Sequence, residues 1–143
     1  MMKWFNILLH AVFGCLGGLL YILIEILWRG YSHWTMILLG GICFVLCGIL
    51  DEVQRKPPII LQMLQSAVII TVLEFITGCI VNLWLGWNVW DYSELPFNIL
   101  GQVCLYFFFA WFFLAYLVIK TENLLHKLVD NIKKSLSLTR KRY

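Results

Sequence analysis

The chain has 143 residues, of which 62% are hydrophobic and 13% are charged, whereas soluble domains contain roughly 45–50% apolar and about 25% charged residues. With a mean hydropathy of +0.84, a soluble fold would leave too much apolar surface in water, which excludes a soluble enzyme. Long apolar runs exclude a disordered chain. All five cysteines lie inside these runs, which excludes a disulfide-built secreted module.

Four apolar runs have lengths suited to a bilayer core about 30 Å thick, which needs roughly 20 residues of helix. We predict an all-α integral membrane protein with a four-helix transmembrane domain, residues 1–119, followed by a tail at 120–143. The predicted spans are 5–28, 34–50, 59–85 and 97–119. The connections between them are short and hold the turn-forming residues, so neighbouring helices should be antiparallel in an up-and-down bundle.

The distribution of basic residues predicts the orientation. With four spans, the N-terminus, the middle loop and the tail share one side, which holds ten of the eleven Lys and Arg residues. Only Arg29 is predicted on the opposite side. Because basic residues collect on the cytoplasmic side, we predict that both termini are cytoplasmic. The tryptophans that favour the outer boundary are Trp28, Trp34, Trp84, Trp87 and Trp90.

The tail at 120–143 has the pattern of a basic amphipathic helix. Leu124, Leu128, Ile132 and Leu136 follow one another at four-residue spacing, with lysines interleaved. Such a C-terminal cytoplasmic helix can lie along the inner leaflet, with its leucines in lipid and its lysines among anionic headgroups. Alternatively, it docks a cytoplasmic partner such as an ATPase.

Short matches suggest an internal repeat of the two helix pairs. Ile24-Glu25 matches Leu73-Glu74, and Leu39–Cys43 matches Leu100–Cys104. Such a duplication would give both halves the same orientation in the membrane, as in parallel repeats of some transporters. Coincidence among apolar helices explains the matches equally well.

Glu25 and Arg29 are charged residues at the outer end of the first predicted helix. Charge in hydrocarbon costs roughly 2.5–3.5 kcal/mol even on a lenient insertion scale, so such residues are usually paired, hydrated or functional. Their spacing of four residues puts them on one helical face, where a purely structural ion pair can form. Alternatively, Glu25, Arg29 and His33 together form an outer-leaflet site.

Glu74 precedes the end of the third predicted span by eleven residues, which is about 16 Å of helix and places it near the bilayer midplane. No basic side chain is expected within reach, so the carboxyl must be protonated, hydrogen-bonded to neutral groups or facing a wet cavity. Gly78 and Asn82 follow at i+4 and i+8 and form a stripe that must face protein. Either Glu74 only bonds helix to helix, or it is a proton-coupled or substrate-contacting acid.

Further polar residues gather at the outer level near the start of the fourth predicted helix. Asn98 and Gln102 share a helical face there, and Asp91 and Tyr92 lie in the preceding loop. Their convergence predicts a polar pocket open to the outside. Alternatively, they only cap the helix and satisfy the loop backbone. The candidate substrate-binding residues are Glu25, Arg29, His33, Glu74, Asn82, Asp91, Tyr92, Asn98 and Gln102.

Several motifs are absent from the sequence. It contains no Gly-rich nucleotide loop ending in Lys-Ser/Thr, so any ATPase would be a separate chain. It contains no CxxC pair and no metal-type cluster of His, Cys and acidic residues. We therefore expect no catalytic residue, no metal, no cofactor and no nucleic-acid partner. Gly14 and Gly18 form a small-xxx-small pattern that allows close helix packing, within the bundle or across a dimer.

Several motifs together resemble a known family. Glu74–Gly78, followed by Trp90–Asn98 (WDYSELPFN) and Gly101–Cys104, resembles the putative ABC-transporter type IV permease family of small bacterial membrane proteins. The residues of the first half that are similar to one subgroup are Glu25, Arg29-Gly30, Ser32–Trp34 and Gly40-Gly41. The resemblance spans nearly all of residues 20–119 and implies a multi-pass transport protein of the bacterial cytoplasmic membrane.

Three functions remain open. The first is a permease-like subunit with an outer polar pocket for a small molecule or lipid headgroup, oligomeric because four helices rarely enclose a pathway alone. The second is a membrane-embedded enzyme or binding protein for lipid or envelope precursors. The third is a structural adaptor whose basic tail recruits a partner. The expected partners are therefore membrane lipid, further copies of the chain, and a separate ATPase or envelope protein.

Overall fold

The computed structural model describes residues 2–53 and 57–140. The basic residues Arg55, Lys56, Lys141 and Arg142, which contribute to the predicted orientation, lie outside these ranges. The chain forms, in order, α1 (Met2–Arg29), α2 (Trp34–Val53), α3 (Ile59–Gly78), the π-helical turn η1 (Cys79–Trp84), β1 (Asn98–Ile99), β2 (Val103–Cys104) and α4 (Leu105–Arg140). The predominantly helical fold class is confirmed.

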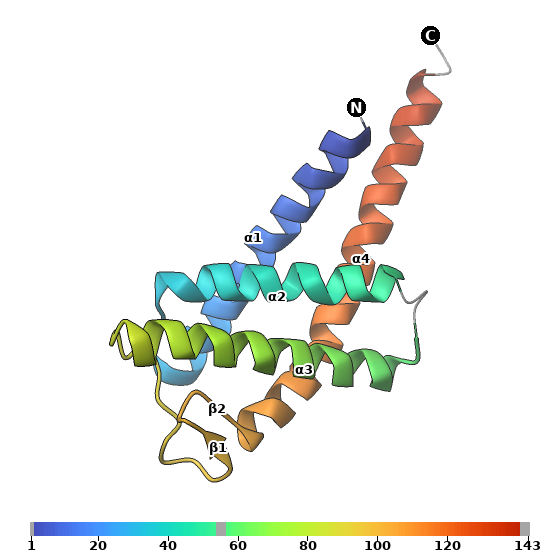
Figure 1. Cartoon of the computed structure of the whole chain (residues 1–143). Coiled ribbons are helices and arrows are strands. Elements are labelled where there is room, and N and C mark those ends of the chain that lie inside the picture. Colours follow the sequence, from blue (N-terminus) through green and yellow to red (C-terminus); the bar gives the residue numbers. More distant parts are fainter. Residues whose placement is uncertain (1, 54–56, 141–143) are drawn as a thin grey trace.

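Glycine and proline set the turns between the first three helices. Gly30 ends α1 with a positive φ of 79°, and its amide donates to the carbonyl of Ile26 at 2.9 Å, as in a common helix C-terminal motif. Pro58 precedes α3 and accepts from the amides of Leu61 and Gln62. Both turns are short, and α3 runs back alongside α2 in the opposite direction (Figure 1).

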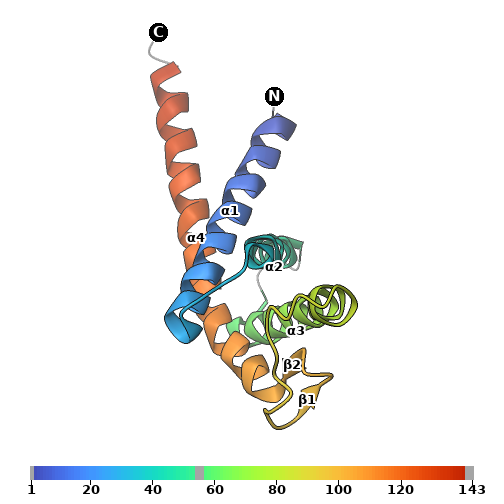
Figure 2. The same cartoon turned by 90° about the vertical axis from the view of Figure 1, so that its left-hand side faces the viewer.

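The four helices do not lie parallel to one another. α2 and α3 lie side by side, and α1 and α4 cross them at a steep angle (Figures 1 and 2). α1 begins and α4 ends at the same end of the molecule, where the two helices splay apart (Figure 2). Of the predicted antiparallel neighbours, α2 and α3 are seen as such (Figure 1), whereas the arrangement of all four helices as an up-and-down transmembrane bundle stays a prediction.

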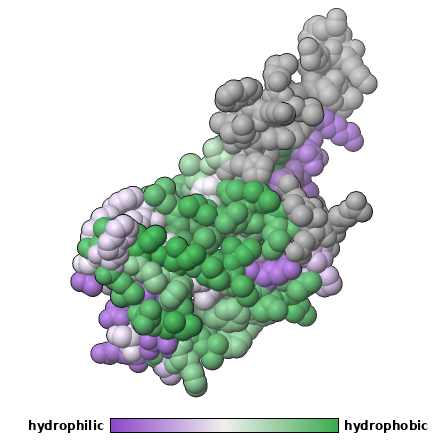
Figure 3. All heavy atoms as spheres, in the orientation of Figure 1, coloured by the Kyte–Doolittle hydropathy of each residue, from purple (hydrophilic) through white to green (hydrophobic). Residues whose placement is uncertain are grey.

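The lengths of the apolar helices fit a membrane protein. Within residues 2–53 and 57–140, three helical stretches are long and apolar enough to cross a bilayer: Ala11–Arg29, Ile59–Trp84 and Leu105–Ile132. The apolar part of α2, Trp34–Leu50, is shorter. A broad hydrophobic surface covers α2 and α3, and hydrophilic residues gather toward the loops (Figure 3).

Small residues bring α1 and α2 into close contact. A Cβ atom on Gly18 would lie 2.4 Å from the carbonyl oxygen of Ile37, and one on Gly41 would lie 2.6 Å from the carbonyl oxygen of Gly14. Backbones that approach this closely tolerate only glycine, as at small-xxx-small interfaces. The predicted role of Gly14 and Gly18 in close packing is therefore seen within the chain, between α1 and α2.

One face of α3 and η1 is buried along its length. Its buried residues include Ser66, Ile70, Glu74, Gly78 and Asn82, each four positions after the last. This confirms that the stripe faces protein. Gly78 is required there, because a Cβ at this position would lie 2.5 Å from Oε1 of Gln102. The stripe brings Glu74 and Asn82 toward the loop and α4.

The start of the predicted fourth span is wrong. Residues 97–104 form a small antiparallel hairpin, in which Asn98 pairs with Cys104 and Ile99 with Val103, and α4 begins only at Leu105. Phe97, Leu100 and Gly101 have positive φ values of 54°, 53° and 70°, which a right-handed helix cannot contain. Asn98 and Gln102 therefore do not share a helical face.

The structure also bears on the predicted tail and on the predicted internal repeat. α4 continues to Arg140 without a break at residue 120, so the tail is helical but extends the fourth helix and is not a separate element. The two segments of the proposed repeat also differ, because Leu39–Cys43 is helical and Leu100–Cys104 belongs to the hairpin. The internal repeat is therefore not supported by the secondary structure.

Candidate functional site

Glu74 lies at the centre of a buried aromatic cluster. Its side chain is 1% exposed. Three neutral groups donate hydrogen bonds to it: the hydroxyls of Tyr21 and Tyr92 reach Oε1 at 3.3 Å each, and Nε1 of Trp111 reaches Oε2 at 2.9 Å. The donors come from α1, the loop and α4, so one carboxyl joins three parts of the chain to α3.

The partners of Glu74 match one of the three predicted states, a carboxyl hydrogen-bonded to neutral groups. The indole of Trp111 can only donate. Burial raises the pKa of the Tyr92 phenol above its ordinary range, and the nearby Glu74 adds to this effect, so Tyr92 keeps its proton and can donate. Ring stacking holds all three donors in place. The ring centres of Tyr21 and Trp111 lie 5.4 Å apart, and those of Tyr92 and Phe107 lie 4.5 Å apart.

A cavity of about 180 Å³ lies beside this cluster, toward the α1–α2 turn and the loop. We call it the loop-side cavity. Tyr21, Tyr92 and Trp111, the three donors to Glu74, form part of its wall. The other lining residues are Ile24, Glu25, Trp28, Arg29, Tyr31, Trp90, Asp91 and Phe107. Glu74 itself does not line the cavity, but it is hydrogen-bonded to the hydroxyls of Tyr21 and Tyr92, which do.

Glu25 and Arg29 form the predicted ion pair at the edge of this cavity. The other carboxylate oxygen of Glu25 accepts a hydrogen bond from the hydroxyl of Ser32. Arg29 also donates from Nη1 to the carbonyl of Val89 at 3.1 Å, and its guanidinium lies 4.8 Å from the centre of the Tyr31 ring. The pair is 11% and 18% exposed, so it is shielded but reachable from solvent.

Asn82 and Gln102 form a second polar group that holds the loop in place. Asn82 donates to Oε1 of Gln102 at 2.8 Å and accepts from the amide of Val89 at 2.7 Å. The carbonyl of Gln102 accepts from Nε1 of Trp90 at 2.9 Å. The side-chain amides of Asn82 and Gln102 thus form hydrogen bonds with each other and with the backbone, and neither residue lines the loop-side cavity. Asn82 and Gln102 therefore lie beside the predicted pocket and hold the loop, and their role in binding stays a prediction.

Asn98 likewise supports the hairpin. Its amide nitrogen donates to the carbonyls of Ser93 and Leu95 at 3.0 and 2.8 Å, and its oxygen accepts from the amide of Gly101 at 3.0 Å. Asp91 accepts from the amide of Ser93 at 2.8 Å but also lines the loop-side cavity. The alternative that these residues satisfy the loop backbone therefore holds for Asn98 and in part for Asp91.

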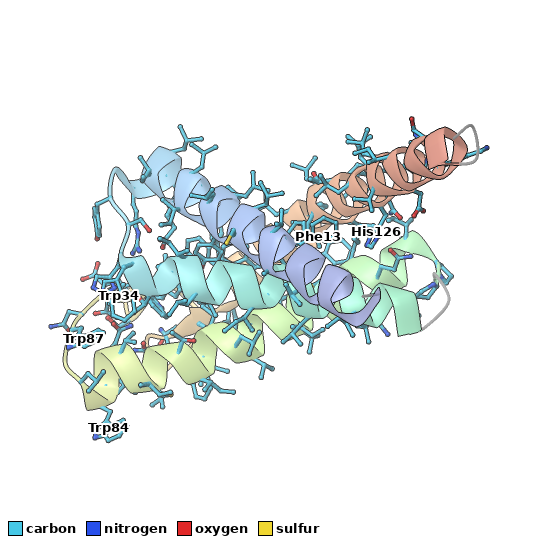
Figure 4. All side chains as sticks on the ribbon, turned by 90° about the horizontal axis from the view of Figure 1, so that it is seen from above. Phe13, Trp34, Trp84, Trp87 and His126 are labelled. Carbon is cyan, nitrogen blue, oxygen red and sulfur yellow. The ribbon has the colours of Figure 1, made fainter. Side chains whose placement is uncertain are left out.

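His33 lies in an aromatic group apart from the cavity. Its ring is 5.6 Å from Trp34 and 5.7 Å from Trp87, and its Nδ1 lies 2.8 Å from the hydroxyl of Thr35 at the start of α2. Figure 4 shows Trp34 and Trp87 together at this end, while Trp84 points outward from η1. The predicted line of Glu25, Arg29 and His33 is therefore not formed as one site.

A second cavity, the central cavity, lies next to the loop-side cavity. It measures about 60 Å³ and shares Tyr21, Ile24 and Trp111 with the loop-side cavity. Its remaining lining residues are apolar or small: Gly17, Leu20, Gly40, Cys43, Phe44, Cys47, Ile70, Leu114, Ala115 and Val118. Beyond it, a hollow of about 10 Å³ lined by Gln62, Gln65 and Ser66 shares Cys47.

Two aromatic residues of the site, Tyr21 and Trp111, are not predicted from the sequence because both lie within apolar runs, although both bind Glu74. The usable signal is that aromatic side chains with a polar atom usually find a partner when buried. Among the residues that the structure describes, no group of three His, Cys, Asp or Glu side chains is placed to hold a metal.

Comparison with known proteins gives one match. A family model with the description "Putative ABC-transporter type IV" matches residues 5–140. No curated protein and no solved structure matches the chain. The family match covers nearly the whole sequence and includes every residue of the Glu74 cluster and of the loop-side cavity.

Proposed function

The chain belongs to the Putative ABC-transporter type IV family, and on this premise we propose that it is a permease-like membrane subunit. Its loop-side cavity would receive a small molecule or a lipid headgroup. The observation that carries the proposal is a pair of neighbouring cavities, the loop-side cavity and the central cavity, which share Tyr21, Ile24 and Trp111. A structural adaptor has no need of such cavities.

The stacked rings of Tyr21 and Trp111 line both cavities. Glu74 accepts a hydrogen bond from each ring. We propose that this pair is the barrier to passage and that Glu74 holds it closed. A solute in the loop-side cavity would open the barrier by competing for Tyr21 or by changing the charge of Glu74.

We further propose that the four helices span the membrane with both termini in the cytoplasm. This orientation puts the loop-side cavity toward the outside. The central cavity of about 60 Å³ is too small for passage without movement, so further copies of the chain or a separate ATPase would have to drive the opening. The basic end of α4 is the proposed docking segment for that partner.

Accessibility of Ile24 tests the proposal without knowledge of the substrate, because Ile24 lines both cavities. Ile24→Cys in a cysteine-free background is expressed as the full chain in its native membranes, so that natural partners are present. Right-side-out and inside-out vesicles are then treated with a membrane-impermeant maleimide. A permease exposes the barrier to both sides, so we expect labelling in both preparations.

Two matched variants report the orientation. Ser93→Cys, in the exposed part of the loop, should react only in right-side-out vesicles. Lys127→Cys, on the exposed surface of α4, should react only in inside-out vesicles. Labelling of Ile24→Cys from the outside alone would overturn the permease proposal and leave a binding protein. The reverse pattern for Ser93 and Lys127 would overturn the proposed topology.

A further inference from the structure

We propose that the loop-side cavity recognises a small organic cation, that is, an amine or a quaternary ammonium group attached to an organic body. The inference rests on the proposed function for the role of the cavity and adds the chemical class of its ligand. Three features support this inference: the aromatic walls of the cavity, the existing contacts of Arg29, and the apolar lining of the neighbouring central cavity.

The walls of the loop-side cavity are mostly aromatic, since seven of its eleven lining residues are Tyr, Trp or Phe. Cations bind to the faces of such rings, and sites for quaternary ammonium groups are built from them. Trp28 and Tyr31 are 64% and 61% exposed, so these rings are open to a ligand that enters. Tyr31 already faces one cation, the guanidinium of Arg29 at 4.8 Å.

The charges in the cavity favour a cation over an anion. Glu25 and Asp91 line it against a single basic residue among the described ones, Arg29. The guanidinium of Arg29 is already bound through its two terminal nitrogens to Glu25 and the carbonyl of Val89, and it faces the Tyr31 ring. Its Nε has no hydrogen-bond partner among the described residues, but it is buried and out of reach of a ligand in the cavity. A phosphate or carboxylate ligand would have to break the contacts of the terminal nitrogens. A cation meets Asp91 instead, whose Oδ1 alone is engaged, by the amide of Ser93.

The size of the cavity and its continuation select an organic ligand over a metal ion. About 180 Å³ lies below the roughly 300–1,000 Å³ of typical small-molecule pockets, which suits a headgroup or a small amine. The central cavity has no charged side chain in its wall, so a bare inorganic ion would lose its hydration there without compensation. An ammonium group that carries its own alkyl surface loses much less.

Binding of tetramethylammonium chloride to the full chain in phosphatidylglycerol nanodiscs tests the inference. Tryptophan fluorescence and calorimetry report binding, and sodium chloride at the same ionic strength is the reference. We expect saturable binding of tetramethylammonium and none of sodium. Addition of phosphatidylethanolamine to the nanodiscs identifies the source: competition indicates a lipid amine headgroup, and unchanged affinity indicates a soluble cation.

Matched variants locate the site. Trp28→Leu should weaken tetramethylammonium binding about fivefold or more through loss of a ring face. Trp84→Leu, which removes an 81% exposed tryptophan outside the cavity, should leave it unchanged. Asp91→Asn should also weaken binding, whereas Glu94→Gln, an exposed acid outside the cavity, should not.

Absence of saturable binding, or equal losses in the variants inside and outside the cavity, would overturn the inference. These results do not depend on the labelling of Ile24→Cys. If the cation binds but Ile24 reacts from one side only, the ligand class stands and transport fails. If Ile24 reacts from both sides but no cation binds, transport stands and the ligand class fails.

Discussion

Glu74 and Glu25 lie in neighbouring regions of the same fold, yet the protein accommodates them by different means. Glu74 is 1% exposed and receives hydrogen bonds from three neutral aromatic side chains. Glu25 lies at the edge of a cavity and is paired with Arg29 on the next turn of α1. Burial explains the difference, because an arginine at the end of α1 can reach solvent and one beside the buried Glu74 could not.

The contrast shows that aromatic donors can replace a counter-ion. An ion pair gains little at an exposed site and loses much to desolvation in a buried one. Neutral donors cost less to bury, and they also bring their rings into the core. Two of these rings, Tyr21 and Trp111, also line both cavities, which is where we propose the barrier to passage.

The largest effect is expected from Glu74→Leu, which leaves three buried donors without an acceptor. Each buried unsatisfied group costs about 1–3 kcal/mol, so the free energy of unfolding should fall by about 3 kcal/mol or more in a denaturant titration of the reconstituted protein. Glu74→Gln keeps an acceptor for Trp111 and should stay within about 1 kcal/mol of the wild type. A leucine variant as stable as the wild type would disprove the hydrogen-bonded role of Glu74.

The glutamine variant also separates the two roles predicted for Glu74. If the carboxyl only ties helices together, Glu74→Gln should function like the wild type. If Glu74 exchanges a proton or responds to a cation, labelling of Ile24→Cys from the cytoplasmic side should fall although the melting temperature is unchanged. A normal labelling pattern in the glutamine variant would remove the acid chemistry of Glu74 from the mechanism.

The position of α1 affects both glutamates, because α1 carries Tyr21 and Glu25. Gly18→Ala would put a Cβ 2.4 Å from the carbonyl oxygen of Ile37, so α1 and α2 must separate, at a cost of about 2 kcal/mol. Gly14→Ala is the control, since its Cβ would meet Val45 at 3.4 Å, an ordinary contact. Equal melting temperatures for the two variants would contradict the close packing at Gly18.

A smaller loss is expected when a single donor to Glu74 is removed. Trp111→Phe eliminates the 2.9 Å bond to Oε2 and should reduce the free energy of unfolding by about 1.5 kcal/mol. Tyr21→Phe eliminates a longer bond of 3.3 Å and should cost about half as much. A double-mutant cycle with Glu74→Leu, which removes the acceptor for both donors, isolates each bond, and a larger coupling for Tyr21 than for Trp111 would reverse the assignment.

The smallest effect on stability is expected from the Glu25–Arg29 ion pair. A double-mutant cycle of Glu25→Gln and Arg29→Gln should give a coupling of about 0.5 kcal/mol, the value typical of pairs spaced i,i+4 on a helix. The coupling should weaken as salt is added, because the pair is partly exposed to solvent. A coupling above about 3 kcal/mol that does not respond to salt would show that Glu25 is as buried as Glu74.

The sequence was sufficient wherever one local pattern decides the outcome. Apolar length predicted the helices, the i,i+4 spacing predicted the Glu25–Arg29 pair, and the same spacing predicted the buried stripe through Glu74 and Gly78. It failed at residues 97–104, where apolar residues suggested a helix. Positive φ at Phe97 and Leu100 is rare for such residues and is stabilised by contacts from Asn98, Gln102 and the loop, which no local pattern encodes.

The sequence by itself therefore determined the membrane-type composition, the helices and the one ion pair, because these depend on hydropathy and on neighbours along a single helix. Only the tertiary structure decided which residues meet. Tyr21, Tyr92 and Trp111 are far apart in the chain, and their meeting at Glu74 depends on how α1, α3, α4 and the loop pack. The physical reason is that a buried carboxyl without a counter-ion needs hydrogen-bond donors, and here they come from three separate parts of the chain.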